Sequence, residues 1–293
     1  MQKQTFTRGE EIKRVIPLAG GRQLPLSHPL IMGILNVTPD SFSDGGEYIS
    51  VESAVEHALG MVDQGADIID IGGESTRPGS DPVNEDEEQR RILPVVERLR
   101  AESAIPISID TYRASTARLA IGAGADIVND ISALRFDTEM ATLVAEQKAP
   151  LVLMHMLGKP KEMQNNPHYE DCVLEIDGFF AERLEFCQRS GIDKSKIILD
   201  PGIGFGKRLS DNLEILARLG ELARFGLPLL TGASRKSFIG MLSPTEGKAD
   251  ERLGGSIAAA VIAVANGADI VRVHDVAQTV SALKLLQAVK EVQ

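Results

Sequence analysis

Polar side chains follow a series of apolar, strand-like runs at the point where each run ends. The residues at these points are Asn36, Thr76 beyond Gly72 and Gly73, Asp110, Asn129, His155, Asp200, Ser234 to Lys236, and Arg272 with His274. Any one of them could be a hydrogen-bonded structural group. Carboxylates accept from N–H groups, and an arginine can hold an oxyanion through two bonds. In a barrel of parallel strands these ends meet at one rim, so the set as a whole predicts a binding site.

Eight apolar runs supply these ends, and helical patterns separate them. The expected strands are 30–35, 105–109, 151–154, 197–199, 227–230 and the runs that begin at Ile68, Ile127 and Ile270. The expected helices are 51–62, 85–100, 113–123, 137–146, about 170–189, 211–224, 254–266 and 276–290. Strict alternation of buried strands with helices predicts a (β/α)8 barrel, that is, a TIM barrel, with a doubly wound open sheet as the competing architecture.

A repeated phrase supports the alternation. Gly-Ala-Asp followed by a mostly apolar, β-branched run occurs at 65–70, 124–129 and 267–272, each time after a helical pattern. Glycine readily takes the left-handed conformation that ends a helix, and a short connection then leads into the next strand. Each copy therefore predicts one joint between a helix and a strand.

The two ends of the chain lead to expectations beyond the barrel. Apolar runs at 15–18 and 24–26 flank Gly20 and Gly21, which predicts an N-terminal hairpin within residues 1–27. The length suits a single barrel domain over residues 1–293. The segment 257–265 is apolar on nearly every side and needs a covering beyond the barrel wall. We therefore expect self-association, as a homodimer.

Composition excludes several classes of partner. The net charge of −11 argues against general binding to nucleic acid or to anionic membranes. No apolar run approaches the length that spans a bilayer, and the first residues lack the apolar centre of a secretory signal. Cys172 and Cys187 show no metal-ligand spacing, so we expect neither structural zinc nor a disulfide framework, and a reducing cytoplasm fits.

Eight motifs, in order along the chain, carry a family resemblance. They are MGILNVTPDSFSDGG at 32–46, GGESTRPG at 72–79, SIDT at 108–111, VNDIS at 128–132, LMHM at 153–156, LDPGIGFGK at 199–207, SRKSFIG at 234–240 and RVHD at 272–275. Together they resemble the dihydropteroate synthase family over residues 30 to about 276. That resemblance implies condensation of 6-hydroxymethyl-7,8-dihydropterin pyrophosphate with 4-aminobenzoate, which sulfonamides mimic in this family, to give 7,8-dihydropteroate and pyrophosphate.

The resemblance also assigns residues to the two parts of the pterin substrate. The pterin ring is expected at Asp110, Asn129, Met154, Asp200, Phe205 and Lys236, of which Asp110, Asp200 and Lys236 are the expected catalytic residues. The pyrophosphate is expected at Asn36, Thr76, Arg272 and His274. The family implies Mg²⁺ at the pyrophosphate, with Asn36 as the protein ligand.

The loops 38–46 and 75–84 are expected to close over the reaction and to shape the aminobenzoate pocket. The residues expected there are Phe42, Asp44, Arg77, Pro78 and Ser237. We expect C–O bond breaking to run ahead of amine attack, with the carboxylates of Asp110 and Asp200 stabilising a cationic methylene. No nucleophilic side chain is required.

Several residues at or near these motifs allow other interpretations. His155 follows a strand but could equally be a core imidazole, and Lys207 and Arg208 fit solvated loop charges better than ligands. GIGFGK is not a Walker A loop, because Arg208 stands where Ser or Thr is needed. Its glycines fit the close passage of backbone past a flat ligand.

Three other functions remain to be distinguished from this one. A pterin-binding methyltransferase would share the pterin carboxylates but needs no pyrophosphate pocket. Asn36 and the Arg272 to His274 segment indicate such a pocket and so argue against the methyltransferase. A non-catalytic pterin-binding paralogue would show damaged motifs. A barrel enzyme that acts on another phosphorylated metabolite would leave the matching loops unexplained.

Overall fold

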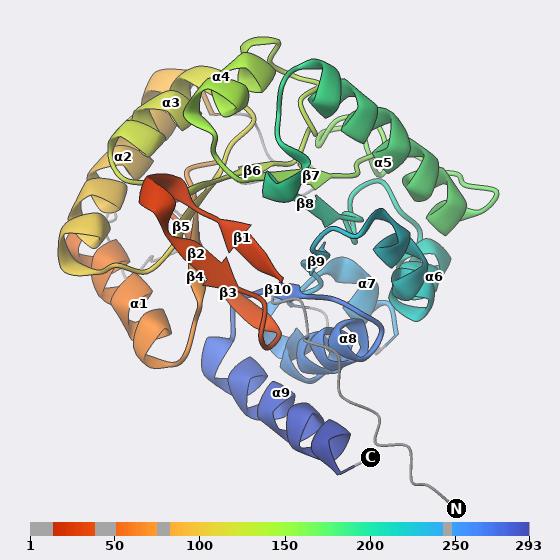
Figure 1. Ribbon diagram of the computed structural model, residues 1–293. Coiled ribbons are helices and arrows are strands. Elements are labelled where there is room, and N and C mark those ends of the chain that lie inside the picture. The colour runs from red at the N-terminus through yellow and green to blue at the C-terminus, as the bar shows by residue number, and fades with distance from the viewer. Residues whose placement is uncertain (1–13, 39–50, 75–82, 243–247, 293) are drawn as a thin grey trace, which may run out of the picture.

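The main sheet is a ring of parallel strands. The structure is a computed structural model that describes residues 14–38, 51–74, 83–242 and 248–292. The eight strands of the sheet are β3 (Leu30–Asn36), β4 (Ile68–Gly72), β5 (Ile107–Asp110), β6 (Ile127–Asp130), β7 (Leu151–Met154), β8 (Ile197–Asp200), β9 (Leu230–Thr231) and β10 (Ile270–Val273). They pair in the order β8, β7, β6, β5, β4, β3, β10, β9. A parallel bridge between Leu199 and Leu229 joins the two ends of this order, so the sheet nearly closes (Figure 1).

Helices surround this ring. They are α1 (Val51–Asp63), α2 (Glu85–Glu102), α3 (Ala114–Gly122), α4 (Glu139–Gln147), α5 (Cys172–Arg189), α6 (Leu209–Arg218), the short α7 (Ser237–Gly240), α8 (Leu253–Ala265) and α9 (Val276–Glu291). The predicted (β/α)8 barrel is confirmed. The expected helix 211–224 is instead α6 followed by a 3-10 segment, Leu219–Phe225, and Gly220 there is a poor helix former. Among the described helices, none has the length and apolar character needed to cross a bilayer.

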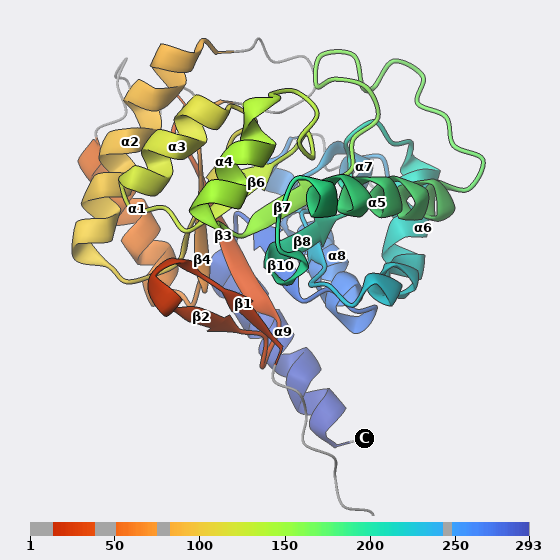
Figure 2. The same ribbon diagram turned by 45° about the horizontal axis from the view of Figure 1, so that its top comes forward.

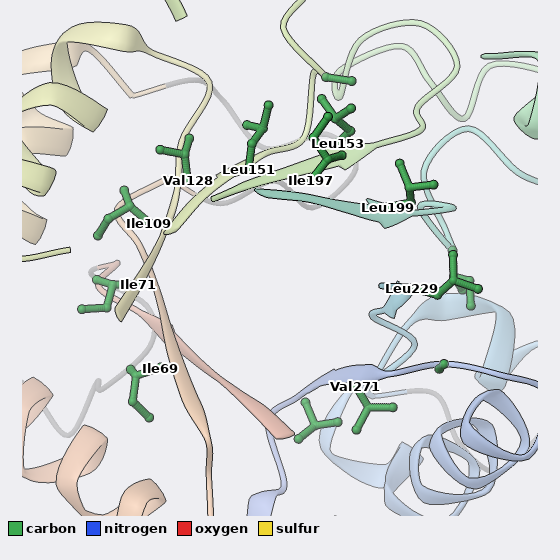
Figure 3. Close-up of a cluster of buried hydrophobic side chains, with 14 of the residues drawn as sticks. Ile69, Ile71, Ile109, Val128, Leu151, Leu153, Ile197, Leu199, Leu229 and Val271 are labelled. Atoms are coloured by element: carbon green, nitrogen blue, oxygen red, sulfur yellow. The ribbon is translucent and has the colours of Figure 1, made fainter. Parts of the chain in front are cut away.

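Alternate residues of the strands pack outward against the helices. Figure 3 shows Ile69, Ile71, Ile109, Val128 and Leu151 among the side chains of this outer layer. All five are fully buried. Because the inner face of the same strands is also buried, the strands have apolar residues on both faces and no alternation that a sequence could reveal.

The inner face is apolar at the N-terminal end of the barrel. Its members there are Leu30, Met32, Ile68, Ile127, Val152, Ile198, Leu230 and Ile270. The antiparallel strands β1 (Val15–Pro17) and β2 (Gln23–Pro25) confirm the predicted hairpin. Ile16, Leu18 and Leu24 of this segment join the same apolar cluster, so the hairpin covers this end of the barrel (Figure 2).

The inner face changes character two residues further along several strands. Since side chains alternate between the two faces of a strand, residues two apart share a face. Ile68 is thus followed by Asp70, Ile127 by Asn129, Ile198 by Asp200, and Ile270 by Arg272, while Asp110 lies on the same face of β5. The polar layer therefore lies above an apolar floor, toward the C-terminal ends of the strands.

Candidate functional site

A guanidinium between two carboxylates forms one half of the polar layer. Arg272 Nε donates to Asp70 Oδ2 over 2.6 Å, and Arg272 Nη2 donates to Asp110 Oδ2 over 2.8 Å. Asn129 Nδ2 also donates to Asp70 Oδ2, over 3.1 Å. Side chains from two strands, β6 and β10, thus hold Asp70 in place. Nη1 is the one guanidinium nitrogen of Arg272 that makes neither of the two carboxylate bonds.

Burial shapes the charge of Asp110. Loss of hydration raises its pKa to about 7, with Arg272 opposing the rise and the nearby Asp70 adding to it. For Arg272, burial acts to lower the pKa, but the carboxylates of Asp70 and Asp110 outweigh it and the pKa is raised. Asp110 can therefore gain or lose a proton near neutral pH while Arg272 keeps its charge.

A second carboxylate and an ammonium form the other half. Asp200 Oδ1 accepts from the amide of Gly202 over 2.7 Å. Lys236 donates to the carbonyl of Ile203, and its Nζ lies 4.5 Å from the centroid of the Phe205 ring. Burial raises the pKa of Asp200, which the charge of Lys236 opposes, and burial lowers the pKa of Lys236 to about 8. The pair is a buried acid and a partly buried base whose pKa values shift toward each other.

The two halves belong to one site. A Cβ built on Gly232 would lie 3.7 Å from Arg272 Cβ and 4.0 Å from Lys236 Nζ, so both cations flank this glycine. A Cβ on Gly72 would lie 3.4 Å from Asp110 Cβ. Glycine at these two points of the rim keeps the space beside the charged groups free of side chains.

An apolar wall stands beside the charged groups. Met154 packs with Ile131, Met156 and Met163, and Phe205 is among the partly buried side chains that pack against them. Thioether and aromatic surfaces suit the face of a flat ring. Carboxylates, an amide and an ammonium at its edge provide acceptors and donors for a polar heterocycle.

The remaining described residues lie at the outer part of the rim. His274 Nδ1 lies 3.0 Å from Ser234 Oγ, which also accepts from the His274 amide over 3.3 Å. Ser237 is exposed and begins α7, and Asn36 is half-buried at the end of β3 beside Gly72. Phe42, Asp44, Thr76, Arg77 and Pro78 lie outside the described residues.

The sequence interpretation missed Asp70, which is fully buried at the centre of the charge cluster. It lies inside β4, whereas the search considered only the ends of the strands. The signal that could have found it is spacing, because Asp70 follows the interior residue Ile68 by two positions. Its other oxygen, Oδ1, is buried and has no hydrogen-bond partner among the described residues.

A network beyond the rim was missed as well. Arg113 forms ion pairs with Glu74 over 2.8 Å and with Glu88 over 2.7 Å, and Tyr112 donates to Glu74. These bonds join the segments that follow β4 and β5 to the first turns of α2. They support the rim from outside rather than adding a group to the polar layer.

The two other open interpretations are settled by burial. His155 lies edge-on to the Phe179 ring, with centroids 4.9 Å apart, and has a lowered pKa, chiefly because it is buried, so it is a core imidazole. The expectation that Lys207 is a solvated loop charge is wrong, since Lys207 is 4% exposed. The glycines of GIGFGK let the backbone pass close to other residues of the protein, whereas close passage past a ligand was expected. Cβ atoms on Gly202 and Gly204 would collide with the His155 carbonyl oxygen and with Lys236 Cδ, respectively.

Comparison with known proteins identifies the class. A family described as "Pterin binding enzyme" matches residues 32–274. The chain belongs to this family of pterin-binding enzymes.

Within the family the chain resembles dihydropteroate synthases. It is 50% identical to the Escherichia coli (strain K12) dihydropteroate synthase over 92% of this chain and 95% of that one. The Xanthomonas albilineans dihydropteroate synthase structure with 4-aminobenzoic acid is 47% identical, with a TM-score of 0.90 over 96% of this chain and 100% of that one. A structure of the X. albilineans enzyme with 7,8-dihydropteroate is 46% identical, with a TM-score of 0.86 over 95% and 100%.

Proposed function

We infer that the chain condenses 6-hydroxymethyl-7,8-dihydropterin pyrophosphate with 4-aminobenzoate, forming 7,8-dihydropteroate and pyrophosphate in folate biosynthesis. The observation that carries this inference is the polar layer in which buried Asn129 and Asp200 and partly buried Asp110 and Lys236 lie together beside apolar side chains. A pterin is flat and edged with donors and acceptors, so this layer matches it. A site that hydrogen-bonds its ligand in this way rejects analogues that would leave its polar groups unpaired.

The charges also suit the reaction. The C–O bond of the substrate breaks, the electron pair leaves with pyrophosphate, and the carboxylates of Asp110 and Asp200 stabilise the cationic methylene. The amine nitrogen of 4-aminobenzoate then bonds to that carbon and loses a proton. Fixed charges in a site that excludes water stabilise such a transition state strongly.

The leaving group belongs at the outer part of the rim. We propose that His274, whose Nδ1 faces Ser234, lies beside the pyrophosphate, and that Arg272 contacts it through Nη1. Thr76 would add a donor, and Phe42, Asp44, Arg77, Pro78 and Ser237 would surround the aminobenzoate. The approach of the amine would then come from the side of Ser237, which is exposed at the start of α7.

Mg²⁺ fits this site only with the substrate present. The described residues contain no group of three or more His, Cys, Asp and Glu placed to hold a metal ion. Asn36 offers one neutral oxygen at the rim, so phosphate oxygens and water would have to complete the shell, as is usual for this ion. Mg²⁺ bound there would supply charge that offsets the leaving pyrophosphate.

Neither cysteine provides an alternative nucleophile. Cys172 and Cys187 are buried free thiols, and burial raises their pKa values to about 12 and about 11. A thiolate is the reactive form, so both are inert. Free thiols also agree with the cytoplasmic location we propose, which cell fractionation would test.

Release of pyrophosphate tests the proposed reaction. We expect release from the pterin pyrophosphate to depend on 4-aminobenzoate and to stop when EDTA removes Mg²⁺, with recovery on adding Mg²⁺ back. A coupled phosphate assay measures this. A protein that binds 6-hydroxymethylpterin but releases no pyrophosphate under any of these conditions would contradict the proposal and indicate a non-catalytic pterin binder.

We propose that the chain forms a homodimer through α8 and α9. Ile262 of α8 is 45% exposed, and Leu285 and Val289 of α9 are 68% and 46% exposed, although the two helices pack on each other. Large apolar side chains on neighbouring helices are typical of an interface. We expect Leu285→Glu to shift the sedimentation coefficient from dimer to monomer, with Leu174→Glu on α5 as the control. A wild-type protein that sediments as a monomer would contradict this.

A further inference from the structure

Lys207 is a buried lysine that has only neutral hydrogen-bond partners. It lies between β8 and α6, and its Nζ is 3.0 Å from His155 Nδ1, 3.1 Å from the Phe205 carbonyl oxygen and 3.4 Å from the His155 carbonyl oxygen. An ammonium has three protons, and these are three acceptors. Within the part of the chain that the structure describes, no carboxylate lies within ion-pair distance of Lys207.

These bonds connect two loops at the rim. His155 follows β7, and Phe205 lies in the segment after β8. The same segment begins with Asp200, whose carbonyl accepts from the His155 amide over 2.9 Å. Gly202 has a φ of +67° and no room for a Cβ against the His155 carbonyl oxygen, so the segment must pass close to His155. Lys207 therefore fixes the backbone that carries both Asp200 and Phe205.

We propose that Lys207 is a positioning residue of the pterin pocket, which ties the Asp200 to Phe205 segment to the end of β7 and places a positive charge behind Asp200. This rests on the proposed function, in which Asp200 and Phe205 face the pterin. Lys207 touches neither substrate in this arrangement. It acts through the Phe205 ring, against which Lys236 lies, and through the charge of Asp200.

The surroundings of Lys207 make its charge sensitive to pH. The titratable groups that face it are His155 after β7, Cys172 at the start of α5, Asp200 at the end of β8, Asp211 in α6 and Lys236 before α7. Burial lowers the pKa of Lys207 to about 7, and the negative charge of Asp200 opposes this. As the pH rises through that value, the amine loses one donor and its charge, and it turns a lone pair toward one of its three acceptors.

Replacement of Lys207 by Met keeps most of the side-chain volume and removes the three bonds. A hydrogen bond to a charged group is worth a factor of about ten or more in an equilibrium constant. We therefore expect Lys207→Met to raise the Kd for 6-hydroxymethylpterin about tenfold at about pH 6. Wild-type Lys207 is largely neutral at about pH 8.5, so the loss there should be about threefold or less. Isothermal titration calorimetry at the two pH values measures both.

A matched lysine controls for the loss of a buried tether. Lys196 donates from Nζ to the Pro17 carbonyl over 3.0 Å at the opposite end of the barrel, and burial lowers its pKa as well. Lys196→Met should leave pterin affinity unchanged at both pH values. Equal loss in the two variants, or wild-type affinity in Lys207→Met at both pH values, would overturn the positioning role.

Two further variants keep the test decisive. If Lys207→Met does not fold, Lys207→Gln replaces it, because glutamine retains an N–H donor but carries no charge. The expected result is the same: a larger loss of pterin affinity at about pH 6 than at about pH 8.5. Asp200→Asn separates this inference from the proposed function. Unchanged pterin affinity in Asp200→Asn would refute the pocket assignment itself, whereas a loss in Asp200→Asn with none in the Lys207 variants would refute only the role of Lys207.

Discussion

Replacement of Asp110 by Asn is expected to lower kcat/KM by about 100- to 1,000-fold, the usual cost of removing one fixed group that stabilises transition-state charge. The carboxylate lies 2.8 Å from Arg272 and beside the pterin space that Gly72 leaves free. Asn has the same shape and keeps one oxygen for Arg272, so folding should be preserved. What is lost is the negative charge beside the developing cation. Steady-state pyrophosphate release together with thermal unfolding would measure both effects.

The pH profile identifies the group responsible. Burial raises the pKa of Asp110 to about 7, so the ionised form accumulates as pH rises through that value. In the wild type, kcat/KM should therefore rise with pH around 7, and this rise should be absent in Asp110→Asn. The matched control is Asp193→Asn, an exposed residue whose side chain accepts from the Ser195 amide far from the rim. Near-wild-type turnover in Asp110→Asn would refute the assigned role.

The barrel could be predicted from the sequence because its signals are local. The three Gly-Ala-Asp joints show this most directly. Gly65, Gly124 and Gly267 all have positive φ, near +103°, +114° and +104°, the backbone region that favours glycine after the last turn of an α-helix. The strands that follow begin at Ile68, Ile127 and Ile270, as expected. Three copies of this short helix-to-strand joint were enough to predict that strands and helices alternate along the chain.

The inner face of the barrel could not be predicted in full, because it has no local signal. Ile68, Ile69 and Ile71 are all completely buried, yet they divide between the floor of the barrel and the helix layer. A parallel strand buried on both faces shows no alternation, so Asp70 looked like part of a helix-to-strand joint. Its partner Arg272 is 202 positions away, and only the closed ring brings the two together.

The burial of Lys207 could not be predicted from the sequence for a related reason. A lysine next to an arginine in a glycine-rich loop is usually solvated, and only one of its three acceptors, the Phe205 carbonyl, is near it in the sequence. Two of its three partner atoms belong to His155, 52 positions earlier, and the chain can pack this closely only because Gly202 lacks a side chain. Burial of such a charge is a property of the assembled loops. The roles of Phe42, Asp44, Thr76, Arg77 and Pro78 stay predictions, since they lie outside the described residues.

Replacement of Arg272 by Met is expected to lower the free energy of unfolding by about 3–5 kcal/mol, because it leaves buried carboxylates without their cation. Asp70 is 0% exposed, and its carboxylate would keep only the hydrogen bond from the Asn129 side chain. Asp110 would lose its 2.8 Å bond from Arg272. Urea unfolding would measure the change. The control is Arg14→Met, since Arg14 is 47% exposed in its pair with Asp269 and should cost about 1 kcal/mol or less.

The dependence on pH shows whether unpaired charge is the cause. Without Arg272 the pKa of Asp110, already raised to about 7 by burial, would rise further above its value in the unfolded chain. The folded variant then binds more protons than the unfolded one, so its stability should fall as pH increases through neutrality. A second change, Asp70→Asn, should restore part of the loss at about pH 8 and less at about pH 5, where protonation already relieves the charge. Equal costs for Arg272→Met and Arg14→Met at both pH values would show that the two carboxylates do not depend on the guanidinium, and the charge cluster would then have no structural role.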